Sequence, residues 1–249
     1  MLRKESIEMD CYYVTGASRG LGRALVERIL AAPDTKVIGV ARTPGPSDPH
    51  YSHRLVDLTQ PEQVQAFEFD AHDGAERAIL INNAGLIKVG QVGSIDPADL
   101  TAIHLANAVA PAILTNAFLK ACRGSSLRQA VVCNLTSRGG SLPIPGGAAY
   151  CSAKAALEMF TRVAAREAEL SSDTRLRFMI ANPGEVDTEM QSYLAAANET
   201  DFPFAEMVRK RKADGLLMSP ELVADRLFKV LRDPDLVSDI RFDVQELAT

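Results

Sequence analysis

The sequence has 249 residues, of which 47% are hydrophobic and 24% are charged, and these values are typical of a globular chain with one sizeable core. Its 27 Lys and Arg residues against 32 Asp and Glu residues give a net charge of −5. This balance argues against nucleic acid as the main partner, because phosphate binding requires a clustered basic excess. The short basic run at residues 209–212 fits a solvated helix face better than a binding patch.

The cysteine and histidine positions indicate neither a disulfide framework nor a metal site. The four cysteines show no Cys-x-x-Cys spacing, which favours a reducing compartment, and the four histidines do not gather with them. The first ten residues lack the apolar core of a signal peptide, and no apolar span of 18 residues is evident. We therefore expect a cytoplasmic protein that does not enter a membrane.

Apolar runs rich in β-branched residues alternate along the chain with longer segments of helical periodicity. Strands are predicted at residues 11–16, 36–41, 53–58, 77–82, 130–135 and 175–182. After the first of them, Leu21, Leu25 and Ile29 recur at helical spacing. The alternation predicts an α/β fold, a Rossmann-type doubly wound parallel sheet of about seven strands with helices on both faces. The ligand crevice of such a sheet lies at the carboxyl ends of its strands.

The chain shows no linker, repeat or low-complexity tract that would divide it. We expect residues 1–9 to be an N-terminal extension and residues 10–249 to form one dinucleotide-binding and catalytic domain. The region 188–218 is less regular, because NETDFPF at 198–204 interrupts a helical pattern. Since this region follows a strand end late in the chain, it is the candidate for a substrate lid over the crevice.

A glycine-rich segment, VTGASRGLGRAL at 14–25, follows the first predicted strand and opens the first predicted helix. Gly16, Gly20 and Gly22 permit a tight turn and a close approach of the backbone to a pyrophosphate. The helix N-terminus then supplies free N–H groups and the positive end of its dipole. This context favours a dinucleotide phosphate site over an ordinary glycine-rich turn.

The end of the second predicted strand indicates which dinucleotide is used. NAD-binding folds usually place an acidic residue there for the ribose hydroxyls, whereas this chain has Ala41 followed by Arg42. Arg19 lies inside the glycine loop. Either arginine alone would also suit a surface, but the pair without a carboxylate favours a 2′-phosphate. The sequence therefore predicts NADPH/NADP as the cofactor.

Tyr150 and Lys154 stand four positions apart in the alanine-rich run 148–156, one turn apart on one face of a helix. Two ordinary surface residues would show the same spacing. A free tyrosine has a pKa of about 10, poorly matched to proton exchange near neutrality. A lysine ammonium and an oxidised nicotinamide nearby would both stabilise the phenolate and lower that pKa. Ser137, after the fifth predicted strand, can donate a hydrogen bond to a substrate carbonyl.

Taken together, these motifs resemble the short-chain dehydrogenase/reductase family. They are TGASRGLG at 15–22, NNAG at 82–85, Ser137, YCSAK at 150–154 and NPGEVDT at 182–188, in the family's order and at its typical distances. The resemblance covers nearly the whole chain. Within the family, PGEVDTEMQ at 183–191 and the tail LVSDIRFDVQEL at 236–247 are most similar to sepiapterin reductases and benzil-type carbonyl reductases.

The resemblance implies a catalytic set of Asn107, Ser137, Tyr150 and Lys154. In the family the asparagine helps to hold a water chain that leads to the lysine, although a polar residue inside a helix is the alternative for Asn107. The implied cofactor contacts are Gly16, Ser18, Arg19, Gly20, Leu21, Gly22, Arg42, Asp57, Leu58, Asn83, Ala84, Gly85, Tyr150, Lys154, Pro183, Gly184, Val186 and Thr188.

For some of these residues the resemblance also implies which part of the cofactor or substrate they contact. Asp57 would lie near the adenine, and the segment 183–188 would meet the nicotinamide and the pyrophosphate. The alternative role of Asn82 and Asn83 is to brace the sheet. The tail places Asp243 where sepiapterin reductases anchor the pterin, so substrate contacts are expected from Ser137, Tyr150 and Asp243. A surface carboxylate that closes the last strand is the competing interpretation of Asp243.

The sequence predicts NADPH-dependent reduction of a small ketone or vicinal dicarbonyl to the alcohol, with Tyr150 as the general acid. An NADP-dependent alcohol dehydrogenase working in the oxidative direction would use the same residues, with the tyrosine as base. A protein that senses NADP(H) without turnover is the third hypothesis, but such proteins usually lose the tyrosine or the lysine. The helices expected within 98–121 and 149–170 often pair in the family, which implies a homodimer or homotetramer.

Overall fold

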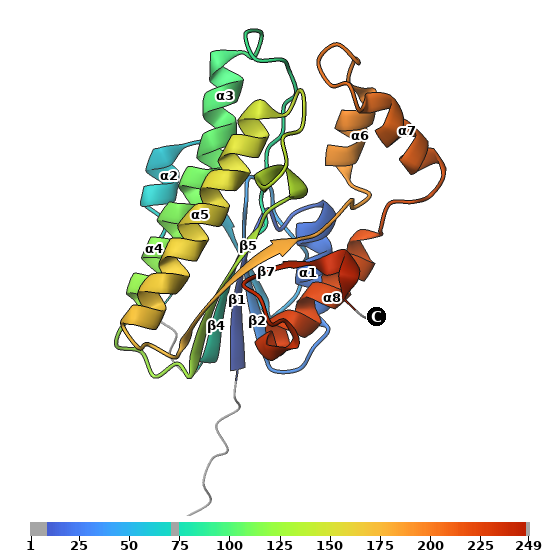
Figure 1. Cartoon of the computed structure of the whole chain (residues 1–249). Coiled ribbons are helices and arrows are strands. Elements are labelled where there is room, and N and C mark those ends of the chain that lie inside the picture. Colours follow the sequence, from blue (N-terminus) through green and yellow to red (C-terminus); the bar gives the residue numbers. More distant parts are fainter. Residues whose placement is uncertain (1–8, 71–74, 248–249) are drawn as a thin grey trace, which may run out of the picture.

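All seven strands of the central sheet run parallel, in the order β3-β2-β1-β4-β5-β6-β7. The computed structural model describes residues 9–70 and 75–247 (Figure 1). The strands are β1 (Met9–Thr15), β2 (Thr35–Ala41), β3 (Tyr51–Leu55), β4 (Ala75–Asn82), β5 (Gln129–Leu135), β6 (Leu176–Asn182) and β7 (Arg241–Asp243). The predicted Rossmann-type sheet is confirmed.

The predicted strands differ from the observed ones only at their ends. The largest difference is in β3, predicted at 53–58, because the chain leaves the edge of the sheet after Leu55. The backbone N–H of Val56 still donates to the carbonyl of Ala41, at 3.2 Å. Of the residues 1–9 expected as an N-terminal extension, Met9 pairs in β1, and residues 1–8 lie outside the described part of the chain.

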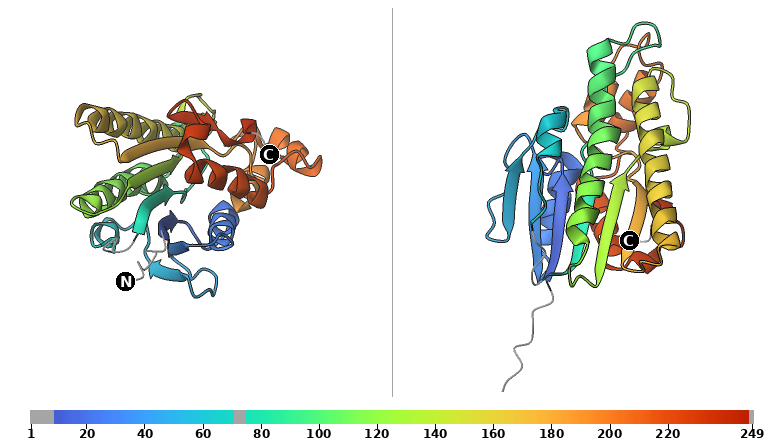
Figure 2. Two further views of the ribbon diagram at one scale, coloured as in Figure 1. Left: turned by 90° about the horizontal axis from the view of Figure 1, so that it is seen from below. Right: turned by 90° about the vertical axis from the view of Figure 1, so that its left-hand side faces the viewer.

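Helices cover both faces of this sheet, as predicted. The helices α1 (Gly20–Leu30) and α8 (Pro220–Arg232) lie on one face, and α2 (Pro61–Gln65), α4 (Ala110–Cys122) and α5 (Ala148–Leu170) lie on the other (Figure 2). On the first face, Leu25 and Ile29 of α1 pack with Leu227 of α8 against the strands. On the second, Leu114 and Phe118 of α4 are fully buried. The helical periodicity of the sequence therefore marks the buried stripes.

Local signals fix where two of the helices begin. The helix α8 starts at Pro220, and the Ser219 hydroxyl caps it by accepting from the backbone N–H of Leu222 at 3.1 Å. The helix α3 (Pro97–His104) starts in the same manner, with Asp96 accepting from the N–H of Ala98 at 2.7 Å. Both helices follow the preference for a Ser or Asp cap before a first-turn proline.

The helix α3 continues through a π-helical turn, Leu105–Val109, into α4. By length and composition, the run Pro97–Cys122 could cross a membrane, which corrects the expectation that no such apolar span exists. Its apolar residues have another explanation in the fold. Ile103, Leu114 and Phe118 are buried against the sheet and α5, so the helix is apolar because it forms part of the core.

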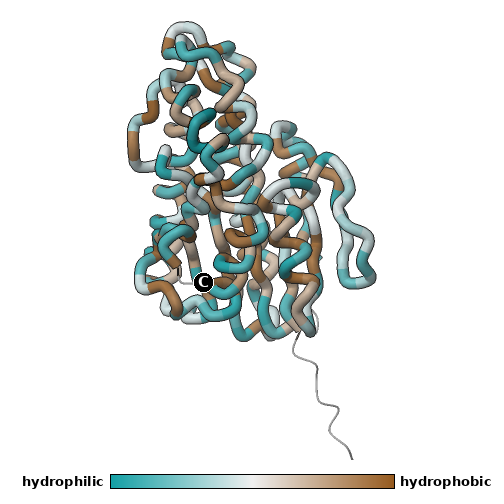
Figure 3. Tube along the Cα trace, turned by 90° about the vertical axis from the view of Figure 1, so that its right-hand side faces the viewer, coloured by the Kyte–Doolittle hydropathy of each residue, from teal (hydrophilic) through white to brown (hydrophobic). Residues whose placement is uncertain are grey.

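Two further helices, α6 (Glu189–Ala196) and α7 (Ala205–Ala213), stand beyond the carboxyl end of the sheet between β6 and α8. Figure 3 looks at the molecule from this side, and hydrophobic and hydrophilic positions mix along the segment. Leu194, Phe202 and Val208 form a small cluster of their own, against which Ile87 and Ile144 pack. The segment therefore rests on the loops after β4 and β5.

Candidate active site

The candidate site begins where the strand order reverses, between β1 and β4. The side chain of Thr15, the last residue of β1, accepts from the N–H of Ala84 at 3.0 Å. The amide of Asn83 donates to the Thr15 carbonyl at 2.9 Å. The glycine loop and the loop after β4 are thus bonded to each other at the switch point, where doubly wound sheets bind their ligands.

Asn82, the last residue of β4, and Asn83, which follows it, both form side-chain hydrogen bonds at this edge. The buried amide of Asn82 donates to Asn134 of β5 at 2.8 Å and to Thr115 of α4 at 3.3 Å. The amide of Asn83 holds the loop after β1, as described above. The side chains of both asparagines therefore fix the frame of the crevice.

The glycine loop folds back on itself so tightly that it forms a cradle. Gly16 and Gly20 have φ angles of +68° and +52°, in the left-handed region that favours glycine. A Cβ atom on Gly22 would lie 2.1 Å from the Gly16 carbonyl oxygen. No side chain caps α1 at Arg19, so the first-turn N–H groups are open to a ligand. The cradle and the open helix end fit a pyrophosphate.

The two predicted cofactor arginines differ in their surroundings. Arg42 directly follows β2, is exposed, and makes no hydrogen bond or ion pair with residues of the described chain. Arg19 is ion-paired with Glu189, the first residue of α6. Both side chains of this pair are exposed, so the pair contributes little to stability and a phosphate could exchange for the carboxylate.

Asp57 and Leu58 lie after β3 at the same edge of the sheet. The Asp57 carboxylate accepts from the backbone N–H and the hydroxyl of Thr59, at 2.9 and 2.8 Å. Its own N–H donates to Gln63 at 2.8 Å, and Leu58 is buried. These bonds turn the chain toward α2, so one oxygen of this carboxylate already has a structural function.

Ser137, Tyr150 and Lys154 come together between the end of β5 and the start of α5. The Ser137 side chain acts on the Tyr150 phenol by lowering its pKa, and its hydroxyl accepts from the N–H of Gly139 at 3.1 Å. The Lys154 ammonium donates to the Leu135 carbonyl at 2.8 Å and lies 5.8 Å from the centre of the Tyr150 ring. Tyr150 is 8% exposed and Lys154 is 3% exposed, so both polar groups are held in a desolvated site.

Burial shifts the pKa values of both groups. Desolvation raises the pKa of Tyr150 to about 12, and the Ser137 side chain partly offsets this rise. Desolvation also lowers the pKa of Lys154 to about 8, and the Glu158 carboxylate acts in the opposite direction. Near neutral pH the phenol is therefore protonated and the lysine is predominantly an ammonium ion.

Asn107 lies in the π-helical turn and is fully buried. Its side-chain oxygen accepts from the N–H of Leu86 at 2.9 Å, and its amide donates to the Leu86 carbonyl at 2.6 Å. A Cβ atom on Gly85 would lie 3.4 Å from that side-chain oxygen and 3.9 Å from the Lys154 ammonium. The structure thus brings Asn107 beside the lysine, and both ends of its amide hold the loop after β4.

The segment 183–188 crosses from β6 to the glycine loop. Gly184 has a φ of +78°, and its N–H donates to the side chain of Asn182 at 3.2 Å. Val186 forms an isolated parallel bridge with Met218, which closes the base of the α6–α7 segment. The Thr188 methyl would lie 3.3 Å from a Cβ atom on Gly20. Two predicted cofactor-contacting segments therefore lie against each other.

Asp243 ends β7 at the same edge, opposite Asn182 in the register. Its Oδ1 accepts from the Asn182 amide at 2.7 Å and lies 3.4 Å from the Arg241 guanidinium. The carboxylate is half-buried, and its bond to Asn182 joins the end of β7 to β6. Its other oxygen is not engaged in either of these bonds.

Glu158 is a site neighbour that the sequence interpretation missed. It lies one turn after Lys154 on α5, it is buried, and its Oε1 would be 2.6 Å from a Cβ atom on Gly140. Arg241 lies 3.5 Å from the same oxygen. The spacing of four residues from Lys154 was the available signal. An acidic residue at that spacing ordinarily forms a surface pair, and only the fold shows that this one is buried.

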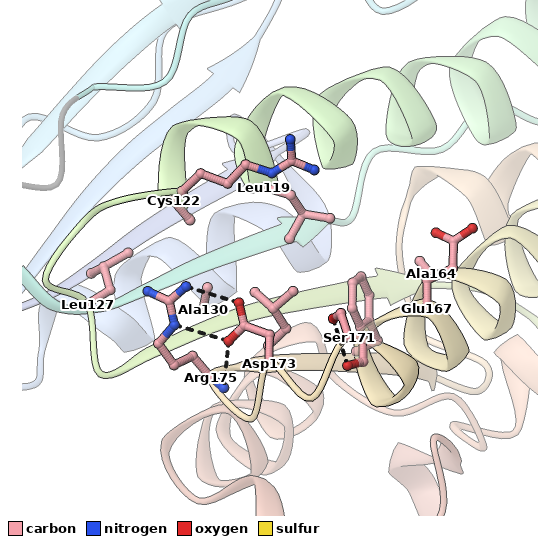
Figure 4. Close-up of a pocket in the computed structure, with 13 residues that line it drawn as sticks. Leu119, Cys122, Leu127, Ala130, Ala164, Glu167, Ser171, Asp173 and Arg175 are labelled. Atoms are coloured by element: carbon pink, nitrogen blue, oxygen red, sulfur yellow. Dashed lines mark hydrogen bonds and ion pairs between the residues drawn. The ribbon is translucent and has the colours of Figure 1, made fainter.

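Two cavities lie away from these residues. One, of about 420 Å³, opens between α4 and α5 over the amino ends of β5 and β6, with Leu119, Arg175 and Phe178 in its wall (Figure 4). The other, of about 500 Å³, lies beside it around Ile240. Neither is lined by a predicted site residue, and both are at the opposite end of the strands from Ser137.

Comparison with known proteins decides the family. The family model for short chain dehydrogenases matches residues 10–199, which is most of the chain. The chain belongs to the short-chain dehydrogenase family. It is an oxidoreductase, as the sequence predicted, and the family match together with the glycine cradle supports a nicotinamide cofactor.

Its relatives include the subgroup that the sequence resembled. A benzil reductase ((S)-benzoin forming) of Bacillus subtilis (strain 168) is 32% identical over 232 residues, covering 90% of this chain and 93% of that protein. A sepiapterin reductase of Mus musculus is 28% identical over 252 residues, covering 92% and 94%. The crystal structure of the KRED1-Pglu enzyme is 26% identical with a TM-score of 0.79, covering 90% and 95% of the two chains.

We expect Gly22→Ala to damage the cradle, because the new methyl group would collide with the Gly16 carbonyl. The overpacking should lower the free energy of unfolding by roughly 1–3 kcal/mol and abolish dinucleotide binding. Thermal denaturation and nucleotide fluorescence measure the two effects. The matched control is Gly90→Ala, whose methyl would meet only Ile95 at 3.5 Å; equal losses in both variants would contradict the cradle.

The lysine pKa predicts a pH dependence of stability. Unfolded lysine keeps its proton up to its ordinary pKa of 10.5, whereas folded Lys154 releases it from about 8. The unfolded state therefore binds more protons between these values, so stability rises with pH in that window. From pH 8 to 10, wild type should gain up to about 2 kcal/mol relative to Lys154→Met in chemical denaturation. If the free energy of unfolding changes with pH in the same way in both proteins, burial does not lower the pKa of Lys154.

Proposed function

We propose that this protein reduces a small ketone or vicinal dicarbonyl to the alcohol, using NADPH. The observation that carries the proposal is the meeting of Ser137, Tyr150 and Lys154 in a desolvated site at the carboxyl edge of the sheet. The glycine cradle and the segment 183–188 lie at this same edge. When bound, the dinucleotide supplies the hydride for the carbonyl carbon.

Ser137 polarises the substrate carbonyl in this mechanism. Its oxygen already accepts from the N–H of Gly139, which turns the hydroxyl and leaves its proton for donation. A donor fixed in this way stabilises the negative charge that develops on the carbonyl oxygen. Tyr150, whose pKa the same serine lowers, then gives its phenolic proton to the developing alkoxide.

Lys154 makes that proton transfer possible. Its bond to the Leu135 carbonyl fixes the ammonium beside the phenol, where its charge stabilises a phenolate. Glu158 keeps this lysine charged despite its burial, because a nearby carboxylate favours the protonated amine. We also infer that the lysine binds the nicotinamide ribose and that Asn107 orders the loop beside it.

The preference for NADPH over NADH rests on the end of β2. Ala41 provides no carboxylate for ribose hydroxyls, and the exposed Arg42 has no partner in the described chain that would compete with a phosphate. Arg19 would join it by exchanging its partner Glu189 for the 2′-phosphate. Asp57 and Leu58 would line the adenine, next to the same edge of the sheet.

The protonation state suits a general acid, while the same residues serve both directions and the supply of reduced or oxidised cofactor sets which one runs. A general acid must hold its proton at neutral pH, and burial keeps the Tyr150 phenol protonated. The oxidative alternative needs a phenolate base, which this site provides only once a bound oxidised nicotinamide lowers the pKa. The hypothesis of a non-catalytic NADP(H) sensor has no support in the site, because the serine, tyrosine and lysine are all in place.

The relatives suggest the substrate class. One is a benzil reductase and another a sepiapterin reductase, and benzil is a vicinal dicarbonyl. A pterin would need an anchor, and the free oxygen of Asp243 would offer one at the carboxyl edge, beside the bonds that this residue makes to Asn182 and Arg241. A diketone needs no such anchor, so benzil-like substrates are the broader proposal.

The remaining features of the proposal concern the whole chain. Residues 10–249 would act as one domain, in which 188–218 is a lid, since α6 and α7 rest on loops that border the site. A homodimer or homotetramer would form through α4 and α5, where Met159 and Val163 are exposed apolar side chains. We place the protein in the cytoplasm because its four cysteines are free thiols and three of them are buried.

The experiment is NADPH oxidation measured against sepiapterin, benzil, 1-phenyl-1,2-propanedione and simple ketones. Tyr150→Phe should lower kcat by roughly 10²–10⁴-fold and leave NADPH binding almost unchanged. The control Ser152→Ala removes a hydroxyl two residues away that bonds His104 outside the site. The kcat of this variant should stay within about twofold of the wild-type value. Full turnover in Tyr150→Phe, or no oxidation with any carbonyl, would contradict the proposal.

A further inference from the structure

Arg42 is held in place by the backbone on either side of it, because its own side chain bonds to no residue of the described chain. The segment that carries it leaves β2 after Ala41 and returns to the sheet at Tyr51. An arginine that recognises a phosphate must present its planar group in a defined direction. The contacts that fix this segment therefore bear on cofactor choice.

The phenol of Tyr51 fills a slot formed by two glycines that lie on either side of Arg42 in the chain. A Cβ atom on Gly39 would lie 1.9 Å from the Tyr51 hydroxyl, and one on Gly45 would lie 2.1 Å from it. Any side chain at either position would expel the ring. The end of β2 and the segment after Arg42 thus close on the same phenol.

His53 completes the arrangement from the same face of β3, two residues further along. Its Nδ1 lies 2.6 Å from the Tyr51 hydroxyl, and its Nε2 lies 3.3 Å from the Ala41 carbonyl. The neutral tautomer that carries its proton on Nε2 satisfies both contacts: the phenol donates to Nδ1, and Nε2–H donates to the carbonyl. Ala41 directly precedes Arg42, so the histidine holds the chain next to the arginine.

Burial of the phenol supports the same hydrogen-bond direction. Desolvation raises the pKa of Tyr51, and the Arg23 guanidinium of α1 acts against this rise. The hydroxyl therefore keeps the proton that it can donate to His53. The residues Tyr51, His53 and Arg23 form the polar surroundings of the slot, between α1 and the edge of the sheet.

We propose that Tyr51 and His53 are a positioning pair that holds Arg42 where a ribose 2′-phosphate binds, and that the pair sets the preference for NADPH over NADH. The inference rests on the proposed use of NADPH. Tyr51 fixes the chain at Gly39 and Gly45, and His53 fixes it at Ala41. Neither residue touches the phosphate, and their effect on the cofactor passes through the backbone that carries the arginine.

The test is the direct binding of NADPH and of NADH, followed by the fluorescence of the reduced nucleotide, so that no turnover is required. Arg42→Ala should weaken the binding of NADPH about tenfold to a hundredfold and leave the dissociation constant of NADH within about twofold. His53→Ala should weaken the binding of NADPH about tenfold and leave the binding of NADH unchanged, since a displaced arginine loses its directed contact with the phosphate. Tyr51→Phe keeps the ring in the slot and removes only the bond to His53, so its loss should be smaller and equally selective.

Two further variants make the test specific. The double variant Arg42→Ala with His53→Ala should bind NADPH no more weakly than Arg42→Ala alone, because the histidine acts only through the arginine. The matched control is His104→Ala. That histidine also contacts a hydroxyl, on Ser152, and a backbone carbonyl, on Leu100, each at 3.0 Å, but it lies on α3. The ratio of the two dissociation constants should not change in this control.

The outcomes separate the two proposals. If Arg42→Ala weakens NADPH selectively while His53→Ala and Tyr51→Phe do not change the ratio, the positioning pair is wrong and the proposed cofactor stands. If His53→Ala weakens both nucleotides equally, the pair has only a structural role and the inference is overturned. If Arg42→Ala leaves the ratio unchanged, the 2′-phosphate argument fails and this inference fails with it.

Discussion

The candidate site is arranged around one buried ammonium group, that of Lys154. A cation in a desolvated position is costly unless it is bonded and compensated, and here each requirement is met by a different element. The Leu135 carbonyl at the end of β5 accepts a hydrogen bond from the ammonium at 2.8 Å, and Glu158, one turn along α5, provides the nearby negative charge. The Tyr150 phenol is also near, because the lysine nitrogen lies 5.8 Å from the centre of its ring.

The fold explains why this cation can sit there. The long helix α5 begins at Ala148, immediately beside the end of β5, so its first turns cover the carboxyl edge of the sheet. The π-helical turn places Asn107 where its amide fixes the loop after β4 around Gly85, close to the ammonium. The same edge carries the glycine cradle, bonded to that loop through Thr15. The proposed dinucleotide site and the proposed proton-transfer site would therefore share one wall.

The sequence predicted the parts of this site that depend on local chain geometry. The glycine loop, the strand ends and the spacing of Tyr150 and Lys154 are read from neighbouring residues, and the parallel sheet follows from its alternating pattern. The short β7 has only three residues, too few for any period to show. The predicted end of β3 was wrong because apolar residues continue past Leu55 in the sequence. Pairing at a sheet edge depends on the register with the neighbouring strand, which the sequence does not show.

The features that the sequence missed are tertiary ones. Glu158 looks like a surface acid until the fold places Gly140 against it and Arg241 beside it. The contact between Tyr51 and Gly45 needs a folded segment, and no pattern in the sequence predicts that two glycines shape a slot. The apolar run Pro97–Cys122 fits a membrane span or a core helix by composition alone, and only its packing against the sheet explains its residues.

The most direct test of the central claim, that Lys154 and the bound oxidised nucleotide together stabilise the phenolate that Tyr150 becomes after giving up its proton, is a tyrosinate titration. The near-ultraviolet difference between wild type and Tyr150→Phe isolates this phenol from the other tyrosines. Without nucleotide, it should ionise near its raised pKa of about 12; with NADP⁺ bound, it should ionise well below that value, and the drop should be lost in Lys154→Met. A Tyr150 pKa that is the same with and without NADP⁺, or that falls equally in Lys154→Met, would contradict the account.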